Sequence, residues 1–300
     1  MDISSSFGFL VLGMMLNLIL YGFMFMQCYL YMSVFKRDAT WIKIFVAYLL
    51  LADTLNTAFT AAILYEYLIA HYGEVDYLSH ATWLFSTDPA LTGIISCSVQ
   101  LFFAYRVKRL TGNIWLAVAI SLLAVAAACG ALGSAIAVNW WHDFDDFRNF
   151  KAVVVIWLVC AAVADVLVTG VLVWYLRKKR TGLVGTDLFL DRIVRLTIQT
   201  GLLTAVFAVV DVVLFLSSPT TLHFLFNMPL AKLYTNSLMS NLNSRSGWEG
   251  GDSKQGAPGS LSERGNGMRL QQLKHSVRLP TIVPSGISDT PGICRGRILS

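Results

Sequence analysis

The sequence predicts an all-α integral membrane protein: a seven-transmembrane-helix bundle with its N-terminus outside, its C-terminus in the cytoplasm and a disordered C-terminal tail. Three observations predict this. Of the 300 residues, 56% are hydrophobic and 14% are charged, whereas soluble domains are about 25% charged. Seven apolar runs occur, most of them near the roughly 20 residues that a helix needs to cross a bilayer. Basic residues also concentrate in alternate connections between these runs, as they do in membrane proteins of fixed orientation.

The apolar runs define the expected membrane domain, residues 1–243. We expect helices at about 7–35, 41–70, 90–105, 114–138, 152–176, 193–216 and 222–242. The first run is too long for the apolar core of a secretory signal and is interpreted as an uncleaved signal-anchor. The third helix is expected to start after Asp88-Pro89, because this pair interrupts the apolar run, or else earlier, near Trp83.

The connections predict the orientation. The first, third and fifth connections carry twelve Lys and Arg residues, and the other three carry two. Because basic residues stay cytoplasmic, the N-terminus is expected outside, in the plasma membrane or another membrane of the secretory pathway. The fifth connection, residues 177–195, has a basic cluster for lipid headgroups or a cytoplasmic partner. Its members are Arg177, Lys178, Lys179 and Arg180.

Residues 244–300 have a different composition. They hold most of the prolines and much of the glycine and serine, with few aromatic residues. Such a segment cannot bury enough apolar surface to fold. We therefore expect a disordered, basic cytoplasmic tail, which is a second region for partner contacts.

Polar side chains inside the expected helices form the candidate site, either for ligand binding or as a structural polar core. They are Asp53, Asn56, Gln100, Asp165, Asp211, Lys232 and Asn236. A charge in hydrocarbon costs roughly 2.5–3.5 kcal/mol on the insertion scale, so these groups are expected to face the bundle interior. At about 1.5 Å per residue, Asp53 and Lys232 both lie near the midplane. An ion pair between them is the sharpest structural hypothesis, and Asp211 is the rival partner of Lys232.

Two interpretations of these groups stay open: they join helices by hydrogen bonds, or they line a ligand cavity or an ion path. No cofactor is expected. A retinal Schiff base on Lys232 is disfavoured because Met228 stands where microbial rhodopsins have an aspartate. The sequence has no metal-ligand spacing, no phosphate-binding glycine loop, no nucleophile with a base at useful spacing and no nucleic-acid module. We therefore expect no metal, no enzymatic activity and no nucleic-acid partner.

The second half of the chain contains several recognisable motifs. They are Ala164-Asp165-Val166-Leu167, Gln199-Thr200-Gly201-Leu202-Leu203-Thr204, Lys232-Leu233-Tyr234-Thr235-Asn236-Ser237-Leu238 and Leu242-Asn243-Ser244-Arg245. With these motifs, residues 164–245 resemble the uncharacterised seven-helix membrane proteins of basidiomycete fungi that carry the domain of unknown function numbered 6534. The resemblance extends over about residues 7–245 and omits the tail. It implies the fold, membrane location and fungal origin, and it implies no activity.

The leading functional hypothesis is a receptor-like or sensor-like protein. It would have a cavity between helices that opens outward to a small-molecule ligand, with Asp53, Asp211 and Lys232 at its chemical core. One alternative is a transporter or ion-coupled carrier that uses the same charges. Another is a structural membrane protein without a ligand.

Overall fold

The computed structural model describes residues 3–71, 82–140, 151–178, 184–217 and 221–244. The chain divides into two units, residues 1–250 and 251–300, and all described residues belong to the first. The expected disorder of the tail concerns residues outside the described ranges, except Ser244. This residue is buried at the end of the last helix.

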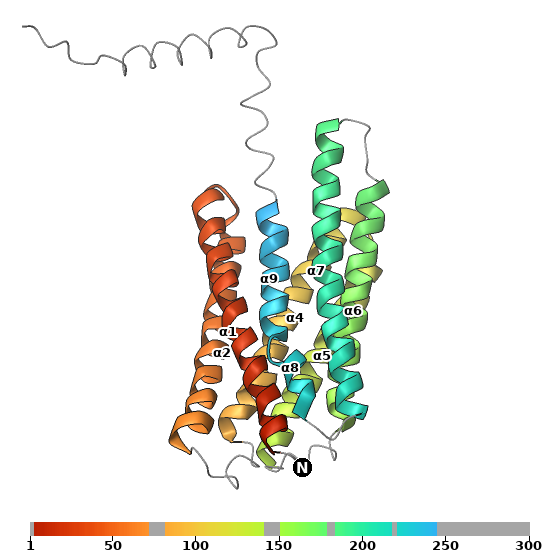
Figure 1. The fold of residues 1–300 in the computed structure, drawn as a ribbon. Coiled ribbons are helices and arrows are strands. Elements are labelled where there is room, and N and C mark those ends of the chain that lie inside the picture. Colours follow the sequence, from red (N-terminus) through yellow and green to blue (C-terminus); the bar gives the residue numbers. More distant parts are fainter. Residues whose placement is uncertain (1–2, 72–81, 141–150, 179–183, 218–220, 245–300) are drawn as a thin grey trace, which may run out of the picture. The chain divides into compact units, whose positions relative to one another are not determined.

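The regular elements of the described residues are helices. They are α1 (Ile3–Val34), α2 (Thr40–Tyr65), the π-helical turn η1 (Glu66–Ala70), α4 (Trp83–Thr111), α5 (Ile114–Trp140), α6 (Lys151–Lys178), α7 (Val184–Ser217), the 3₁₀ turn η3 (Thr221–His223), α8 (Phe224–Asn227) and α9 (Leu230–Asn243). Figure 1 shows the long helices side by side in one bundle. Among the described residues, six helical segments are long and apolar enough to cross a membrane: α1, α2 with η1, α4, α5, α6 and α7 from Leu190.

Helix α4 begins at Trp83, the alternative start, and not at residue 90, and Pro89 lies inside it. A proline removes one backbone donor and disfavours a helical conformation in the preceding residue. In lipid, however, a segment must pair its backbone groups internally, and a helix with one missing bond does so best. Asp88 is therefore a buried helical residue, only 2% exposed, and its prediction as a loop residue was wrong.

The predicted seventh helix, residues 222–242, is broken. Helix α8 ends at Asn227, and α9 begins at Leu230. Pro229 has no N–H to donate to the carbonyl of Leu225, so an uninterrupted helix would lose this hydrogen bond and clash at the proline ring. Helix α9 alone has 14 residues, which is too short to cross a bilayer. It is therefore not one of the six segments named above.

The broken segment nevertheless extends along the bundle beside α4. Near one end, the ring of Phe224 packs 5.0 Å from the ring of Phe85. Near the other end, Arg106 donates a 3.4 Å hydrogen bond to Asn241. At 1.5 Å per residue, Phe85 and Arg106 are about 31 Å apart along α4, which matches the thickness of the hydrocarbon layer.

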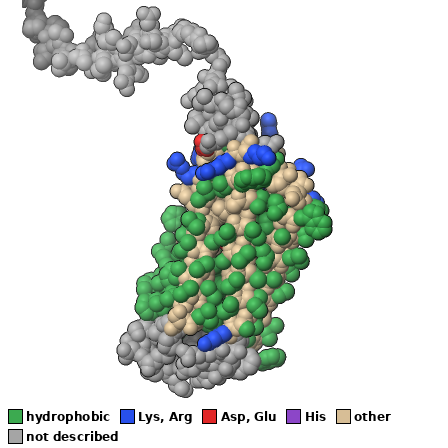
Figure 2. Space-filling model, turned by 90° about the vertical axis from the view of Figure 1, so that its right-hand side faces the viewer, with side chains coloured by type: hydrophobic (Ala, Val, Ile, Leu, Met, Phe, Trp, Pro, Cys, Tyr) green, Lys and Arg blue, Asp and Glu red, His purple; other side chains and the backbone are tan. Residues whose placement is uncertain are grey.

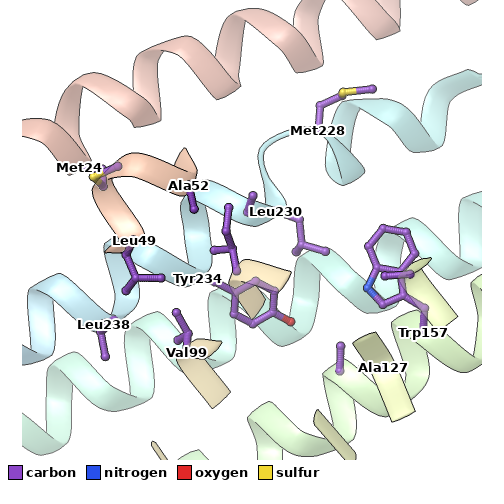
Figure 3. Close-up of a cluster of buried hydrophobic side chains, with 14 of the residues drawn as sticks. Met24, Leu49, Ala52, Val99, Ala127, Trp157, Met228, Leu230, Tyr234 and Leu238 are labelled. Atoms are coloured by element: carbon purple, nitrogen blue, oxygen red, sulfur yellow. The ribbon is translucent and has the colours of Figure 1, made fainter. Parts of the chain in front are cut away.

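Helix α9 is the central helix of the bundle. It contacts α1, α2, α4 and α7, and 11 of its 14 residues are buried. Figure 3 shows buried apolar side chains of α9 packed against those of neighbouring helices. The labelled residues include Leu230, Tyr234 and Leu238 of α9, and they also include Leu49 and Ala52 of α2 and Val99 of α4.

The outer faces are apolar and the interior contains polar groups. Phe23, Leu51 and Leu122 are each more than 60% exposed, while Asp53 and Lys232 are fully buried. Figure 2 shows hydrophobic side chains over most of the described surface on one face, between the two ends of the bundle. This pattern is the reverse of a soluble domain's and fits a lipid solvent. With its six apolar spans, the chain is a multi-pass membrane protein.

Basic side chains gather at one end of the bundle (Figure 2). This end, here called the basic end, is formed by the C-terminal ends of α1, α4, α6 and α9 and the N-terminal ends of α2, α5 and α7. It carries Lys36, Arg37, Lys108, Arg109, Arg177 and Lys178. The opposite end, where α1 begins (Figure 1), is called the N-terminal end.

Candidate functional site

Lys232 lies at the centre of a buried polar network, in the first turn of α9. Its Nζ atom is 3.0 Å from Asp53 Oδ1. It also donates hydrogen bonds to Asn56 Oδ1 at 2.7 Å and to the backbone carbonyl of Asp53 at 3.0 Å. The predicted ion pair is present in the structure, and Asp211, the rival partner, lies elsewhere.

Two asparagines connect this ion pair to α1, α4 and the helix break. Asn56 Nδ2 donates to Asp88 Oδ1 at 3.1 Å. Asn17 Nδ2 donates to Asn56 Oδ1 at 3.3 Å and to the carbonyl of Met228 at 2.7 Å. The break leaves this carbonyl outside the hydrogen-bond ladder of α9, and Asn17 supplies a donor, as polar side chains do at breaks inside membranes. Asn17, Asp53, Asn56, Asp88 and Lys232 are called the lysine network.

Asp211 belongs to a different part of the core, nearer the N-terminal end. This α7 residue is fully buried, and it accepts a 2.7 Å hydrogen bond from Nδ2 of Asn227, the last residue of α8. Asp211 and Asp88 line one cavity of about 40 Å³, with Ser134 and His223 among its other lining residues. This cavity is called the carboxylate cavity. Asp88 belongs both to it and to the lysine network.

Gln100 and Asp165 form a third polar contact, between α4 and α6. Gln100 Nε2 donates to Asp165 Oδ1 at 3.0 Å and to the carbonyl of Ala161 at 3.2 Å. Asp165 lines a second cavity of about 20 Å³, together with Thr204 and Tyr234. The two cavities have no lining residue in common.

Toward the basic end, α9 is held by amide side chains. Asn241 Oδ1 accepts hydrogen bonds from Thr197 Oγ1 at 3.0 Å and from Arg106 at 3.4 Å. Asn236 Nδ2 donates to the carbonyl of Lys232 at 2.8 Å and to the carbonyl of Leu20 at 3.1 Å. These contacts join α9 to α1, α4 and α7 between the ion pair and the basic end.

The predicted polar site residues therefore lie in four separate places. Asp53, Asn56 and Lys232 meet directly, whereas Gln100 pairs with Asp165 and Asp211 pairs with Asn227. Asn236 joins α9 to backbone carbonyls. In the basic cluster, Arg177 and Lys178 are exposed at the end of α6, and Lys178 Nζ lies 5.3 Å from the centre of the Trp174 ring. Lys179 and Arg180 lie outside the described residues.

Sequence reasoning missed several polar residues that the structure places in the core, and four of them carry an amide or a carboxyl group. They are Asn17, Asp88, Asn227 and Asn241, each no more than 8% exposed. Asn17 and Asn227 carry the same signal as the predicted residues: an amide within an apolar run. Asp88 was missed because Asp88-Pro89 was interpreted as an interruption before the helix, which placed Asp88 in the connection.

The cavities limit what this core can bind as it stands. Asp53 and Lys232 line neither cavity and are sealed from solvent. Volumes of about 20 and 40 Å³ admit water or a small ion, whereas pockets for drug-sized ligands measure about 300–1,000 Å³. An organic ligand would therefore require the helices around these two cavities to separate.

Comparison with known proteins gives one match. Residues 161–247 match a family described as a family of unknown function (DUF6534). No curated protein and no solved structure matches the chain. The match agrees with the resemblance drawn from residues 164–245, and its range contains Asp165, Asp211 and all of α9. The part of the chain that carries Lys232 is thus similar to the DUF6534 family, whose function is unknown.

Proposed function

We propose that the chain is a receptor-like or sensor-like protein that crosses its membrane seven times, with the N-terminus outside and the basic end in the cytoplasm. The basic end supports this orientation because Lys and Arg accumulate on the cytoplasmic side. The seventh crossing is supported by the contacts of α8 with Phe85 and of α9 with Arg106, at opposite ends of α4.

The observation that carries the sensor proposal is the position of the ion pair on the central helix. A buried ion pair contributes little net stability, because desolvating both ions offsets their attraction. Its best-attested use is to specify or switch an arrangement. Lys232 lies just after the break at Pro229, on a helix that contacts four others. A change in its pairing would therefore displace a helix with many neighbours.

The same helix connects the core to the basic end. Asn241 is nine residues beyond Lys232 and holds Thr197 and Arg106. A shift of α9 would therefore alter contacts of α7 and α4 beside the exposed Arg177 and Lys178. This end has the charge to bind an anionic headgroup or an acidic cytoplasmic partner.

An ion-coupled carrier is the second candidate. The break at Pro229 favours it, because discontinuous membrane helices form the ion and substrate sites of many carriers. Here the break lies beside Asp88, Asp211 and Lys232. The chain shows no internal repeat of the kind that many carriers have, which is why the sensor is placed first.

One reconstitution experiment tests both candidates. The chain would be placed in liposomes with spin labels at exposed positions 108 and 178, in a variant without other accessible cysteines. We expect the distance between the labels to change when pH or cation concentration is stepped, without solute flux. Flux that Lys232→Met with Asp53→Asn abolishes would identify a carrier. A constant distance without flux would leave a structural protein and contradict both.

A further inference from the structure

Two carboxylates that do not contact Lys232 share the carboxylate cavity. Asp88 comes from α4 and Asp211 from α7, and both line the cavity. Asp88 is 2% exposed and Asp211 is fully buried. Each has one hydrogen-bond donor: Asn56 Nδ2 for Asp88 and Asn227 Nδ2 for Asp211.

The second oxygen of each carboxylate has no hydrogen-bond partner. These atoms, Asp88 Oδ2 and Asp211 Oδ1, are buried and find no donor among the described residues. An ionised carboxylate can accept about four hydrogen bonds. A buried carboxylate with a single neutral donor is poorly compensated, so each must gain a proton or a cation.

The charges around the cavity lead to the same conclusion. The lysine network and the cavity together contain Asp53, Asp88 and Asp211 but a single lysine, which pairs with Asp53. Among the described residues, His223 of η3 is the remaining titratable residue that lines the cavity, and α5 and α6 contribute none. In this part of the chain, no lysine or arginine lines the space that the two carboxylates face.

We propose that Asp88 and Asp211 bind a small monovalent cation, Na⁺, in the carboxylate cavity, and that protons compete with it. The two unpartnered oxygens are hard anionic ligands. Ser134 Oγ, which donates its proton to the carbonyl of Gly130 at 2.9 Å, keeps lone pairs for a cation. The cavity, at about 40 Å³, has room for an ion with one or two waters.

The ligand set is matched to a monovalent cation. Among the described residues, no group of three or more His, Cys, Asp or Glu side chains is placed to hold a metal ion. Zinc sites have three or four such ligands, and calcium sites collect six to eight oxygens with several carboxylates. The site offers too few ligands for either metal. With one Na⁺ bound, the second carboxyl group would keep a proton, so that both negative charges are balanced.

The site is close enough to the N-terminal end for exchange with water. Asp88 is five residues after the start of α4, and Asp211 is six residues before the end of α7. At 1.5 Å per residue, both are about 7–9 Å from those helix ends. This depth is about a quarter of the hydrocarbon thickness, whereas Lys232 lies deeper.

Cation binding at this site would reach the central helix by two short routes. Asn227, the donor to Asp211, ends α8 immediately before the break. Asp88 contacts Asn56, which accepts a hydrogen bond from Lys232. The proposal of a cation site does not depend on the proposed function, because a sensor, a carrier or a structural protein can each bind a cation.

The test is a thermal-unfolding titration of the full chain in detergent with NaCl at constant ionic strength, and choline chloride as the balancing salt. A ligand that binds only the folded state raises the midpoint with concentration. We expect a rise of about 3–6 °C when Na⁺ is at tenfold its dissociation constant, given the size of the chain. The rise should diminish as pH falls from 8 to 5, because protons occupy the same oxygens.

Three variants locate the site. Asp211→Asn and Asp88→Asn should each abolish the difference between Na⁺ and choline. Asp165→Asn, an equally buried carboxylate that lines the other cavity, should keep it. Identical curves in NaCl and choline chloride for the unmodified protein would overturn the proposal, and this comparison decides even if both cavity variants fail to fold. An undiminished response in folded Asp211→Asn or Asp88→Asn would also overturn it.

Discussion

Replacing Lys232 with methionine should destabilise the bundle because it leaves the Asp53 carboxylate buried without its cation. The side chain makes three contacts, to Asp53 Oδ1 and the Asp53 carbonyl at 3.0 Å and to Asn56 Oδ1 at 2.7 Å. Asn56 Oδ1 keeps its contact with Asn17, so the loss centres on Asp53. Breaking a buried pair in this way costs about 3–5 kcal/mol.

Protonation of the carboxyl group sets a limit on this cost. Adding a proton to an aspartate of ordinary acidity costs about 4 kcal/mol at pH 7, so a larger electrostatic penalty would be relieved by protonation. The loss is therefore about 3–4 kcal/mol. For a chain of this size, about 2–4 °C per kcal/mol converts it into a midpoint decrease of roughly 6–16 °C. Thermal unfolding in detergent, followed by tryptophan fluorescence, measures it.

The Lys232→Met variant should also acquire a pH dependence of known sign. Its folded state takes up a proton that the unfolded chain lacks at pH 7. Unfolding then releases a proton, so the free energy of unfolding rises by about 1.4 kcal/mol for each unit by which pH falls. Between pH 7 and pH 5, the deficit relative to the parent protein should shrink by up to about 3 kcal/mol.

A double-mutant cycle tests the reasoning. Lys232→Met with Asp53→Asn should be more stable than Lys232→Met alone, by at least about 2 kcal/mol, since contacting residues couple. The matched control is Lys232→Met with Asp165→Asn, whose effects should add because Asp165 pairs with Gln100 elsewhere. Additive effects in the Asp53 cycle would refute the ion-pair account.

Three further predictions concern the packing, the second polar contact and the lipid-facing surface. Gly13→Ala should lower the free energy of unfolding by about 1–3 kcal/mol, because the added Cβ would lie 2.6 Å from the Phe224 carbonyl oxygen. The control, Gly22→Ala, should be neutral in the same thermal assay, because its added Cβ would have no atom within 4 Å. Gln100→Leu should lower stability by about 1–3 kcal/mol, because a donor to the buried Asp165 carboxylate is lost; an unchanged midpoint would argue against this contact. Leu51→Arg, at an exposed position halfway along α2, should impair membrane insertion by about 3 kcal/mol in a translocation assay. The control, Trp115→Arg at the start of α5, should be tolerated. Equal tolerance of the two variants would contradict a lipid-facing position for Leu51.

Much of the fold could be predicted because the length of each apolar run, and the Lys and Arg residues between the runs, are local features of the sequence. The starts of α5 and α6 were predicted within one residue for this reason. The start of α4 near Trp83 was only the alternative prediction, because Asp88-Pro89 is a strong local signal for a boundary, whereas the requirement to pair backbone groups in lipid acts on the whole segment.

The partners inside the core were only partly predictable. Depth along the helices predicted the ion pair between Asp53 and Lys232, since both residues were expected near the midplane, and the structure contains this pair. Depth could not show that Asp211 would pair with Asn227 or that Asn17 would contact the Met228 carbonyl. Both contacts depend on the break at Pro229, and the prediction had a continuous helix there.

The central claim is that the segment from α8 to α9 carries Lys232 across the membrane as a seventh crossing. The most direct measurement is the accessibility of tags at the two termini of the full chain in intact cells. Seven crossings predict that antibody binds the N-terminal tag without permeabilisation and the C-terminal tag only after it. Equal accessibility of both tags would mean an even number of crossings and would contradict the account.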